Sequence, residues 1–205
     1  LPGSGKGSIV DTLWLLSPDF ALVDPDHIKH DIMADLYEKN PKLKDQMQQD
    51  KEWGTAVHWT SAVLARDLMR DAIASGKDVL FDSSMSTPDQ DKYRELAASA
   101  RAKHYHVNAL ISEVDVDKSI DRAEKRSKKP VVVGDLVLPG RLVTPEYIRG
   151  CDQRLAANLG AYLKEGLFDD VAIYDNNRDG RPVTLQKTYK RVTRPDGSHF
   201  SEEMS

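Results

Sequence analysis

A glycine-rich turn with a single lysine opens the sequence. The first eight residues read LPGSGKGS, so Lys6 follows a glycine directly and a hydroxyl group comes two residues later. In phosphate-binding loops of the G-x-x-x-x-G-K-[ST] type, glycines let backbone N–H groups turn toward phosphates, and the lysine reaches the β- and γ-phosphate oxygens. A chance glycine- and serine-rich turn is the alternative, but the amphipathic pattern of Ser8–Leu16 puts the turn at a helix N-terminus, where anions bind. We predict a nucleotide-phosphate site made of Gly3, Ser4, Gly5, Lys6, Gly7 and Ser8.

Two short apolar runs end in acidic residues. The run FALVD is followed by Pro25 and Asp26, and the run VLFD ends at Asp82. Ligands of open parallel sheets bind at the carboxyl ends of the strands, where a carboxylate can accept the proton of an attacking hydroxyl or hold Mg²⁺. Asp24 or Asp26 fits the first role, unless Asp26 only caps a helix that starts at Ile28. Asp82 fits the second role with Ser8 as a further ligand, unless it is an ordinary turn acid.

The basic residues gather in one stretch of the second half of the chain. Lys125, Arg126, Lys128 and Lys129 lie close together, with Arg122 before them and Arg141 after them. Such a stretch is either a solvated helix end or a set of cations that close on phosphate. The order of phosphate loop, acid, acid and basic stretch is typical of a phosphotransferase, because phosphoryl transfer needs positioning and charge neutralisation more than covalent chemistry.

Short apolar runs alternate with long amphipathic stretches, which predicts an α/β fold with a mostly parallel central sheet flanked by helices in three layers. The expected strands are Phe20–Asp24, Asp78–Asp82, His106–Ile111 and Asp170–Asp175. The expected helices are Ser8–Leu16, Asp26–Lys39, Trp53–Ser75, Asp89–Ala102, Asp115–Ser127 and Pro145–Lys164. We place the main domain at 1–180, with its first strand before residue 1, and a C-terminal β-hairpin appendage at 181–205.

Composition excludes several other classes of protein. The chain has 205 residues, 40% of them hydrophobic and 30% charged, which is the balance of a globular domain. No apolar run approaches the about 18 residues of a membrane span, and the single Cys151 excludes a disulfide framework. The net charge of −4 and the lack of a long basic block argue against a nucleic-acid partner. We expect a cytoplasmic protein, or one delivered into the cytoplasm of a target cell.

Segments along nearly the whole chain resemble the zeta-toxin family of small-molecule kinases. They are LPGSGKGS, VDPDHIKHDI, GKDVLFDSS, SIDRAEKR, GRLVTPE and KEGLFDDVAIYDNN. The last two are specific, because a generic phosphate-loop protein has no reason to carry them. The resemblance implies a P-loop kinase fold, ATP with Mg²⁺, and transfer of the γ-phosphate to a sugar hydroxyl, with UDP-N-acetylglucosamine as the best-known acceptor. An antitoxin partner is implied by analogy alone.

The resemblance also implies roles for single residues. Lys6 would bind the β- and γ-phosphates, and Asp26 would be the catalytic base. Asp82 falls on the acid that ends the third strand of the family fold. Arg122 and Arg141 fall on the two arginines that close over the transferring phosphoryl group.

The sequence departs from the family pattern on the acceptor side. Ser83-Ser84-Met85-Ser86 replaces a Gly-Thr-Gly-Arg-like stretch, and Arg66 occupies a helix position that often bears an acceptor-binding glutamate. We expect Asp82, Ser84 and Arg66 to contact the acceptor. The alternatives are a kinase of the ribose of NAD or another nucleotide, a polynucleotide 5′-hydroxyl kinase, and a nucleotide-binding interaction module without catalysis.

Overall fold

The computed structural model describes residues 2–7, 9, 20–43, 53–138, 140 and 143–204 of this α/β protein. The chain divides into two bodies. The first comprises Leu1–Pro18, Ser84–Ile120 and Thr144–Ser205, and the second comprises Asp19–Ser83 and Asp121–Val143. The helix expected at Ser8–Leu16 lies outside the described residues, apart from Ile9.

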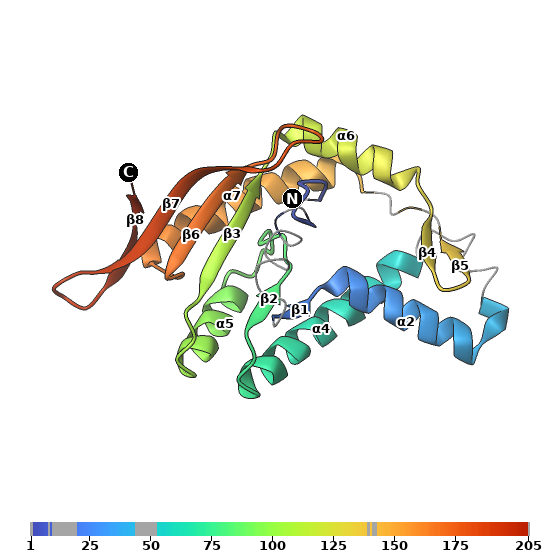
Figure 1. Cartoon of the computed structure of the whole chain (residues 1–205), viewed down its shortest axis with the longest axis horizontal. Coiled ribbons are helices and arrows are strands. Elements are labelled where there is room, and N and C mark those ends of the chain that lie inside the picture. The colour runs from blue at the N-terminus through green and yellow to red at the C-terminus, as the bar shows by residue number, and fades with distance from the viewer. Residues whose placement is uncertain are drawn as a thin grey trace. The chain divides into compact units, whose positions relative to one another are not determined.

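The first body is built on a four-stranded sheet in the order β3-β6-β7-β8 (Figure 1). β3 (Asn108–Glu113) pairs in parallel with β6 (Asp170–Asp175), so their carboxyl ends meet at one edge. β7 (Thr184–Thr193) and β8 (His199–Met204) form the expected C-terminal hairpin. Because β7 pairs antiparallel with β6 as well, the hairpin continues the sheet.

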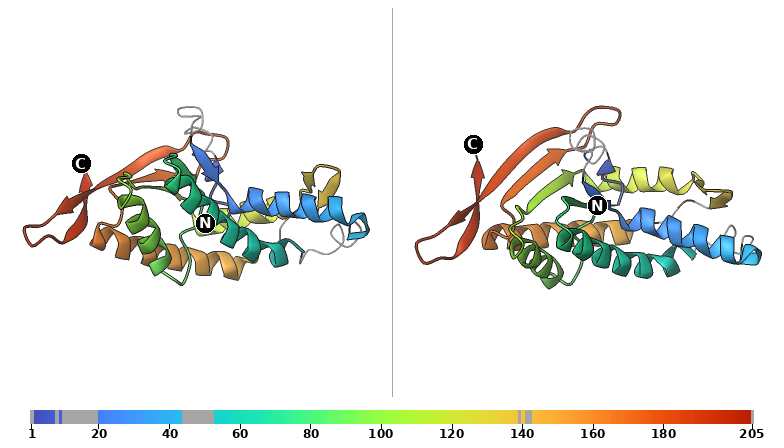
Figure 2. Two further views of the ribbon diagram at one scale, coloured as in Figure 1. Left: turned by 90° about the horizontal axis from the view of Figure 1, so that it is seen from below. Right: turned by 60° about the horizontal axis from the view of Figure 1, so that its bottom comes forward.

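Among the described residues, two helices lie wholly within this body, α5 (Asp91–Arg101) and α7 (Pro145–Glu165), and α7 runs along one face of the sheet (Figure 2). The Thr144 hydroxyl caps α7 by accepting from the N–H of Tyr147, and Gly166 ends it with a left-handed φ of 57°. These two residues account for the ends of the helix expected at Pro145–Lys164, since Thr-Pro starts helices and glycine adopts positive φ without strain. Tyr162 of α7 is completely buried.

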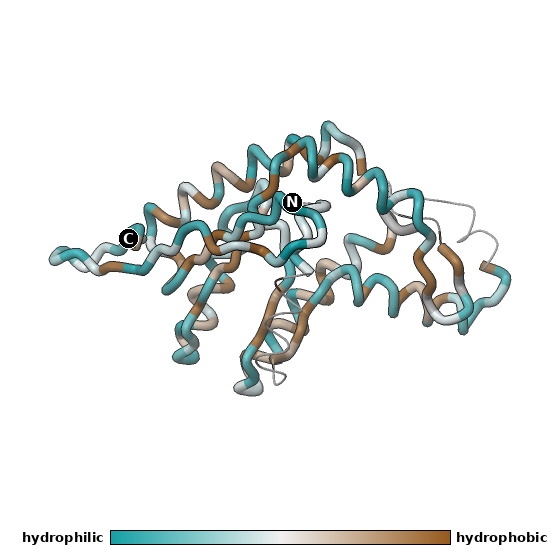
Figure 3. The backbone as a smooth tube through the Cα atoms, turned by 45° about the horizontal axis from the view of Figure 1, so that its top comes forward, coloured by the Kyte–Doolittle hydropathy of each residue, from teal (hydrophilic) through white to brown (hydrophobic). Residues whose placement is uncertain are grey.

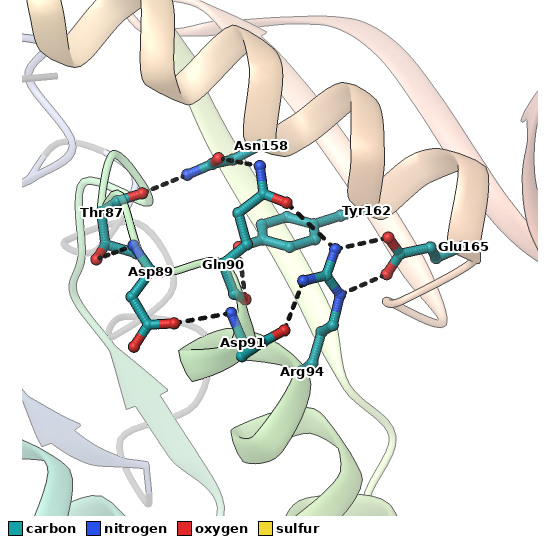
Figure 4. A network of polar contacts seen from close by, with 8 residues as sticks. All are labelled: Thr87, Asp89, Gln90, Asp91, Arg94, Asn158, Tyr162 and Glu165. Atoms are coloured by element: carbon teal, nitrogen blue, oxygen red, sulfur yellow. Dashed lines mark hydrogen bonds and ion pairs between the residues drawn. The ribbon is translucent and has the colours of Figure 1, made fainter.

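Polar side chains connect α7 to α5 and to the loop that precedes α5 (Figure 4). Arg94 of α5 donates two hydrogen bonds to the Glu165 carboxylate at 2.7 and 2.8 Å, which lowers the pKa of that carboxyl. Asn158 of α7 donates to the carbonyls of Met85 and Thr87, both at 2.9 Å. Burial raises the pKa of Tyr162 to about 12, so its hydroxyl remains a donor at neutral pH.

The second body contains a parallel pair of short strands and two long helices. β1 (Ala21–Val23) pairs with β2 (Val79–Phe81) in parallel. α2 (Pro25–Lys39) and α4 (Trp53–Ala74) lie side by side (Figures 1 and 2). The 3-10 helix Pro41–Leu43 follows α2.

A small hairpin completes the second body and was not predicted from the sequence. β4 (Val131–Val133) and β5 (Leu136–Leu138) pair antiparallel around a turn at Gly134. Both strands are strongly hydrophobic (Figure 3). The buried side chain of Leu138 packs with Met33 of α2 and Val57 of α4, which explains why so apolar a segment lies here.

The remaining predicted elements agree with the structure to within about two residues. α6 (Val116–Ser127) begins after Asp115, whose carboxylate accepts from the N–H groups of Asp117 and Lys118. α5 starts two residues after the predicted Asp89. Among the described residues, no helix is both long and apolar enough to cross a membrane.

One partly buried carboxylate joins three segments of the first body. Asp169, just before β6, accepts hydrogen bonds from the Val107 backbone N–H at 2.7 Å, from Arg101 of α5 at 3.2 Å and from Arg191 of β7 at 3.4 Å. Burial alone would raise the pKa of the Asp169 carboxyl, but these three donors together lower it below its usual value.

We expect Asp169→Asn to lower the free energy of unfolding at pH 7 by about 1.5–3 kcal/mol, the range for hydrogen bonds to charged groups. A lowered pKa means that the contribution is present above the unfolded pKa near 4 and is lost as pH falls through the folded value. Denaturant unfolding between pH 3 and 7 should therefore show a smaller acid-induced loss in the variant. An identical pH dependence in both proteins would contradict this role.

Candidate functional site

The glycine-rich turn has the backbone of a loop that only glycine allows. Gly3 and Gly5 have φ values of 82° and 74°. A Cβ atom on Gly3 would lie 2.5 Å from the backbone oxygen of Ser119, and one on Gly5 would lie 2.5 Å from Nδ2 of Asn176. Gly7 has open space around its Cα. The first two glycines are therefore required by the structure, while the third is not.

Side chains from the strand ends of the first body hold this loop by its carbonyl groups. Ser112 of β3 donates to the Ser4 carbonyl at 2.8 Å. Asn176, the first residue after β6, donates from Nδ2 to the carbonyls of Ser4 at 2.7 Å and Gly5 at 3.1 Å. Ser4, Ser112 and Asn176 are all buried. The parallel β3–β6 pair thus positions the phosphate loop.

The start of α6 holds the same loop further upstream. The hydroxyl of the buried Ser119 donates to the Pro2 carbonyl. The loop before α6 is fixed in turn by Asn177, whose side-chain oxygen accepts from the Asp115 N–H at 2.7 Å. The consecutive Asn176 and Asn177 therefore hold the phosphate loop and the start of α6, respectively.

In the second body, two acidic residues leave the β1–β2 pair side by side. Val23 and Phe81 are register partners, and the Asp82 N–H donates to the Val23 carbonyl at 3.0 Å. Asp24 and Asp82 are the next residues on their strands, so the structure brings them together at one carboxyl end. This is the edge at which the sequence predicted a catalytic acid and a metal ligand.

The helix cap at this edge is Asp24, and the alternative that Asp26 caps a helix from Ile28 is wrong. The Asp24 carboxylate accepts from the Asp26 N–H at 2.8 Å, and α2 begins at Pro25, three residues earlier than that alternative required. Proline suits the first helical position because its missing N–H would have no partner there. The Asp26 carboxylate is therefore not consumed by capping.

Asp26 is instead oriented by a buried lysine one turn further along α2. Lys29 Nζ donates to Asp26 Oδ1 at 3.0 Å; the lysine side chain is 7% exposed and the carboxylate side chain 46% exposed. Since a buried ammonium needs an anionic partner, the pair fixes the rotamer of Asp26 and leaves part of its carboxylate open to solvent. Lys29 was not identified from the sequence.

Two histidines of α2, His27 and His30, lie near the Asp24 and Asp26 carboxylates. His27 Nε2 lies 3.7 Å from the Asp24 carboxylate. Burial lowers the pKa of His30, and the neighbouring charge of Lys29 lowers it further. The nearby carboxylates of Asp26 and Asp24 oppose this shift but do not cancel it.

The other predicted site residues are distributed over several elements. Arg66 lies half-buried within α4. Arg122 lies half-buried on α6, three residues after Ser119 and hence on the same face of that helix. Lys6 lies half-buried in the phosphate loop, between Gly5 and Gly7. Ser8 and Arg141 lie outside the described residues.

The segment around Ser84 is held rigidly by α7. The Ser84 and Ser86 hydroxyls are 2.8 Å apart, Arg154 donates to the Ser86 carbonyl at 2.8 Å, and Asn158 holds the carbonyls on either side. Met85 between them has a φ of 51°, a left-handed conformation that costs free energy in a residue other than glycine. The contacts from α7 stabilise this strained backbone.

The carboxylate oxygens of Asp82 are suitable ligands for a hard cation that also binds phosphates. Among the described residues, no three His, Cys, Asp or Glu side chains lie together as a metal centre. Mg²⁺ in phosphotransferases needs only one or two protein oxygens, since phosphates and water supply the other ligands. Asp82 at the carboxyl end of β2 fits that requirement.

Sequence reasoning missed the polar residues that support the site: Lys29, Ser112, Ser119 and Asn176. The available signal was weak. Ser112 and Asn176 are polar residues at the carboxyl ends of buried strands, where ligands bind in open α/β sheets. Which of them points at the loop depends on the register of the β3–β6 pair, in which Ser112 lies opposite Tyr174.

Comparisons with known proteins bear on the family and the fold of the chain. The family model described as zeta toxin matches residues 1–183. The structure is similar to one described as part of the PezAT chromosomal toxin–antitoxin system of the human pathogen Streptococcus pneumoniae, with a TM-score of 0.56 and 14% identity. That likeness covers 85% of this chain and 64% of the other, and at such low identity it shows the fold alone. No curated protein matches the chain.

The contrast between two glycines of the loop is testable by alanine substitution. We expect Gly5→Ala to lower the free energy of unfolding by at least about 1–2 kcal/mol, the cost of a left-handed backbone at an ordinary residue, with the clash against Asn176 in addition. Gly7→Ala is the matched control and should not lower it. Urea unfolding of both variants measures the difference. Equal losses would show that the backbone at Gly5 is not constrained in this way.

Proposed function

The chain belongs to the zeta-toxin family of P-loop kinases, and on that premise we propose that it is an ATP-dependent kinase that phosphorylates a hydroxyl group of a nucleotide sugar, such as UDP-N-acetylglucosamine. The observation that carries this proposal is the phosphate loop Gly3–Gly7, held from behind by buried side chains and bearing Lys6. A preorganised loop of this kind binds phosphates without a cost for ordering it.

In the proposed reaction, Lys6 and the loop N–H groups bind the β- and γ-phosphates of ATP. Mg²⁺, when bound, neutralises charge on these phosphates, and Asp82 and Ser8 are the residues that would hold it. The acceptor hydroxyl oxygen attacks the γ-phosphorus, its proton passes to the Asp26 carboxylate, and ADP leaves. Catalysis in such a reaction rests on positioning and charge stabilisation.

Asp26 supports the base role because its carboxylate is both oriented and accessible. Lys29 occupies Oδ1, and about half of the Asp26 side chain remains exposed. Arg122 and Arg141 are the cations that we propose to stabilise the transferring phosphoryl group. Such contacts act mainly on the transition state, because charge develops there.

The acceptor side is where we propose that this chain differs from its family. Asp82, Ser84 and Arg66 are the proposed acceptor contacts. The strained Met85, fixed by α7, gives the segment after β2 a definite shape of its own. A second candidate acceptor is therefore the ribose hydroxyl of NAD or of another nucleotide.

We further propose that residues 1–180 act as the kinase domain and that the hairpin of β7 and β8 is a tail that extends its sheet. An antitoxin protein is a proposed partner, and the cytoplasm, where ATP is abundant, is the proposed site of action. These proposals follow from the family and from the toxin–antitoxin origin of the similar structure.

The function is tested by incubating the protein with labelled ATP and a panel of nucleotide sugars and dinucleotides, followed by mass spectrometry. We expect one acceptor to gain a phosphate in the presence of Mg²⁺. Lys6→Ala should abolish that product while the protein remains folded by circular dichroism, because its ammonium is aimed at phosphate rather than at the core. Wild-type turnover in this variant would refute the role of the loop.

The base is tested by Asp26→Asn, which keeps the shape of the side chain and its bond to Lys29 but cannot accept a proton. We expect a fall in turnover of about 10²–10⁴, the usual contribution of a positioned base, with little change in nucleotide affinity. Asp24→Asn is the matched control, since asparagine caps a helix as well as aspartate does. Loss of turnover in Asp24→Asn alone would move the base to Asp24.

A further inference from the structure

We propose that Asn176 is a positioning residue for phosphate binding: its side-chain amide sets the direction in which the loop N–H groups point. This inference rests on the proposed function, because it assumes that the loop binds nucleotide phosphates. It concerns a residue that contacts the carbonyl groups of the loop, so Asn176 acts through the loop rather than on a ligand.

The contacts of Asn176 converge on two consecutive carbonyl groups. Its Nδ2 atom donates to the Ser4 carbonyl at 2.7 Å and to the Gly5 carbonyl at 3.1 Å. It also lies 3.4 Å from the Ser112 hydroxyl, which donates to the same Ser4 carbonyl at 2.8 Å. One amide and one hydroxyl, 64 residues apart in the sequence, thus hold the same peptide group.

These carbonyl contacts orient the N–H groups because a peptide unit is planar and trans. Its C=O and N–H bonds point in opposite directions. The carbonyl of Ser4 belongs to the same unit as the Gly5 N–H, and the carbonyl of Gly5 to the same unit as the Lys6 N–H. When Asn176 draws both carbonyls toward the sheet, both N–H groups point away from it, as an anion-binding loop requires.

The fit around Asn176 leaves little freedom for another arrangement. The residue is 7% exposed, and its Nδ2 atom lies where a side chain on Gly5 would begin. Ser119 orients the preceding part of the loop in the same way. Its hydroxyl donates to the Pro2 carbonyl, which belongs to the same peptide unit as the Gly3 N–H. Asn176 differs in controlling two peptide units at the glycine next to Lys6.

The chain offers a matched control in Asn158. This asparagine is also buried, at 3% exposure, and also donates from Nδ2 to two backbone carbonyls, both at 2.9 Å. Asn158 also lies in the first body, but the carbonyls that accept from it belong to Met85 and Thr87. Removing Asn158 should therefore cost a similar amount of structure without releasing the phosphate loop.

The test measures the dissociation constant of ADP by titration calorimetry for wild type, Asn176→Ala and Asn158→Ala, each at a temperature where it is fully folded. We expect both variants to melt at lower temperature than wild type, since each removes a side-chain donor that is shared by two backbone carbonyls. ADP should bind about tenfold more weakly to Asn176→Ala and within about twofold of wild type to Asn158→Ala. A merely structural role would change the melting temperatures and leave both dissociation constants unchanged.

The outcomes separate this inference from the proposed function. A wild-type protein that does not bind ADP overturns the proposed function and the inference with it. Binding by wild type with equal affinity in Asn176→Ala, or an equal loss in Asn158→Ala, overturns the inference alone. If Asn176→Ala does not fold, Asn176→Ser decides, because serine keeps a small polar side chain at this position but lacks the amide that donates to both carbonyls. An unchanged ADP dissociation constant in that variant contradicts the inference, and a weakened one supports it.

Discussion

The carbonyl of Ser4 must be satisfied from within the protein, and much of the first body follows from that requirement. A buried backbone oxygen without a donor costs free energy, and a phosphate loop cannot use its own helix for this purpose. Ser112 and Asn176 meet the need from adjacent parallel strands, both at their carboxyl ends. The register of β3 on β6 and the glycine at position 5 are consequences of the same arrangement, since any side chain there would displace the amide.

In the second body, the nearby carboxylates of Asp24 and Asp26 make different contacts. Asp24 caps α2, and so the helix starts directly at the strand end. Asp26, one position inside the helix, is bonded to the buried Lys29 and keeps an accessible face. A single acid at this position would have to serve both as the cap and as the base that we propose. Two acids separated by proline allow each to adopt one geometry, which is why the spacing D-P-D matters more than the number of charges.

The helix α7 fixes the backbone of the segment that we propose to contact the acceptor. Its polar residues Arg154 and Asn158 bind the backbone of Ser86 and its neighbours, and they hold Met85 in a conformation that most residues avoid. Strain of this kind persists only where surrounding contacts over-determine the backbone. The same helix is anchored to α5 by the pairing of Arg94 with Glu165 (Figure 4). The segment in which we expected a departure from the family pattern, Ser83–Ser86, is therefore held by hydrogen bonds from α7.

The sequence by itself determined the element order, the helix ends at Thr144 and Gly166, the family, and the phosphate loop around Lys6, because these depend on local patterns of residue type and spacing. It did not reveal the β4–β5 hairpin, the cap at Asp24, or the supporting roles of Lys29 and Asn176. The hairpin and Asn176 depend on which distant residues become neighbours. The choice between Asp24 and Asp26 as cap depends on where the helix starts relative to the strand, and Lys29 becomes a partner only once packing buries its ammonium. Tertiary structure decided these points because a hydrogen bond between residues 4 and 176 has no local sequence signal.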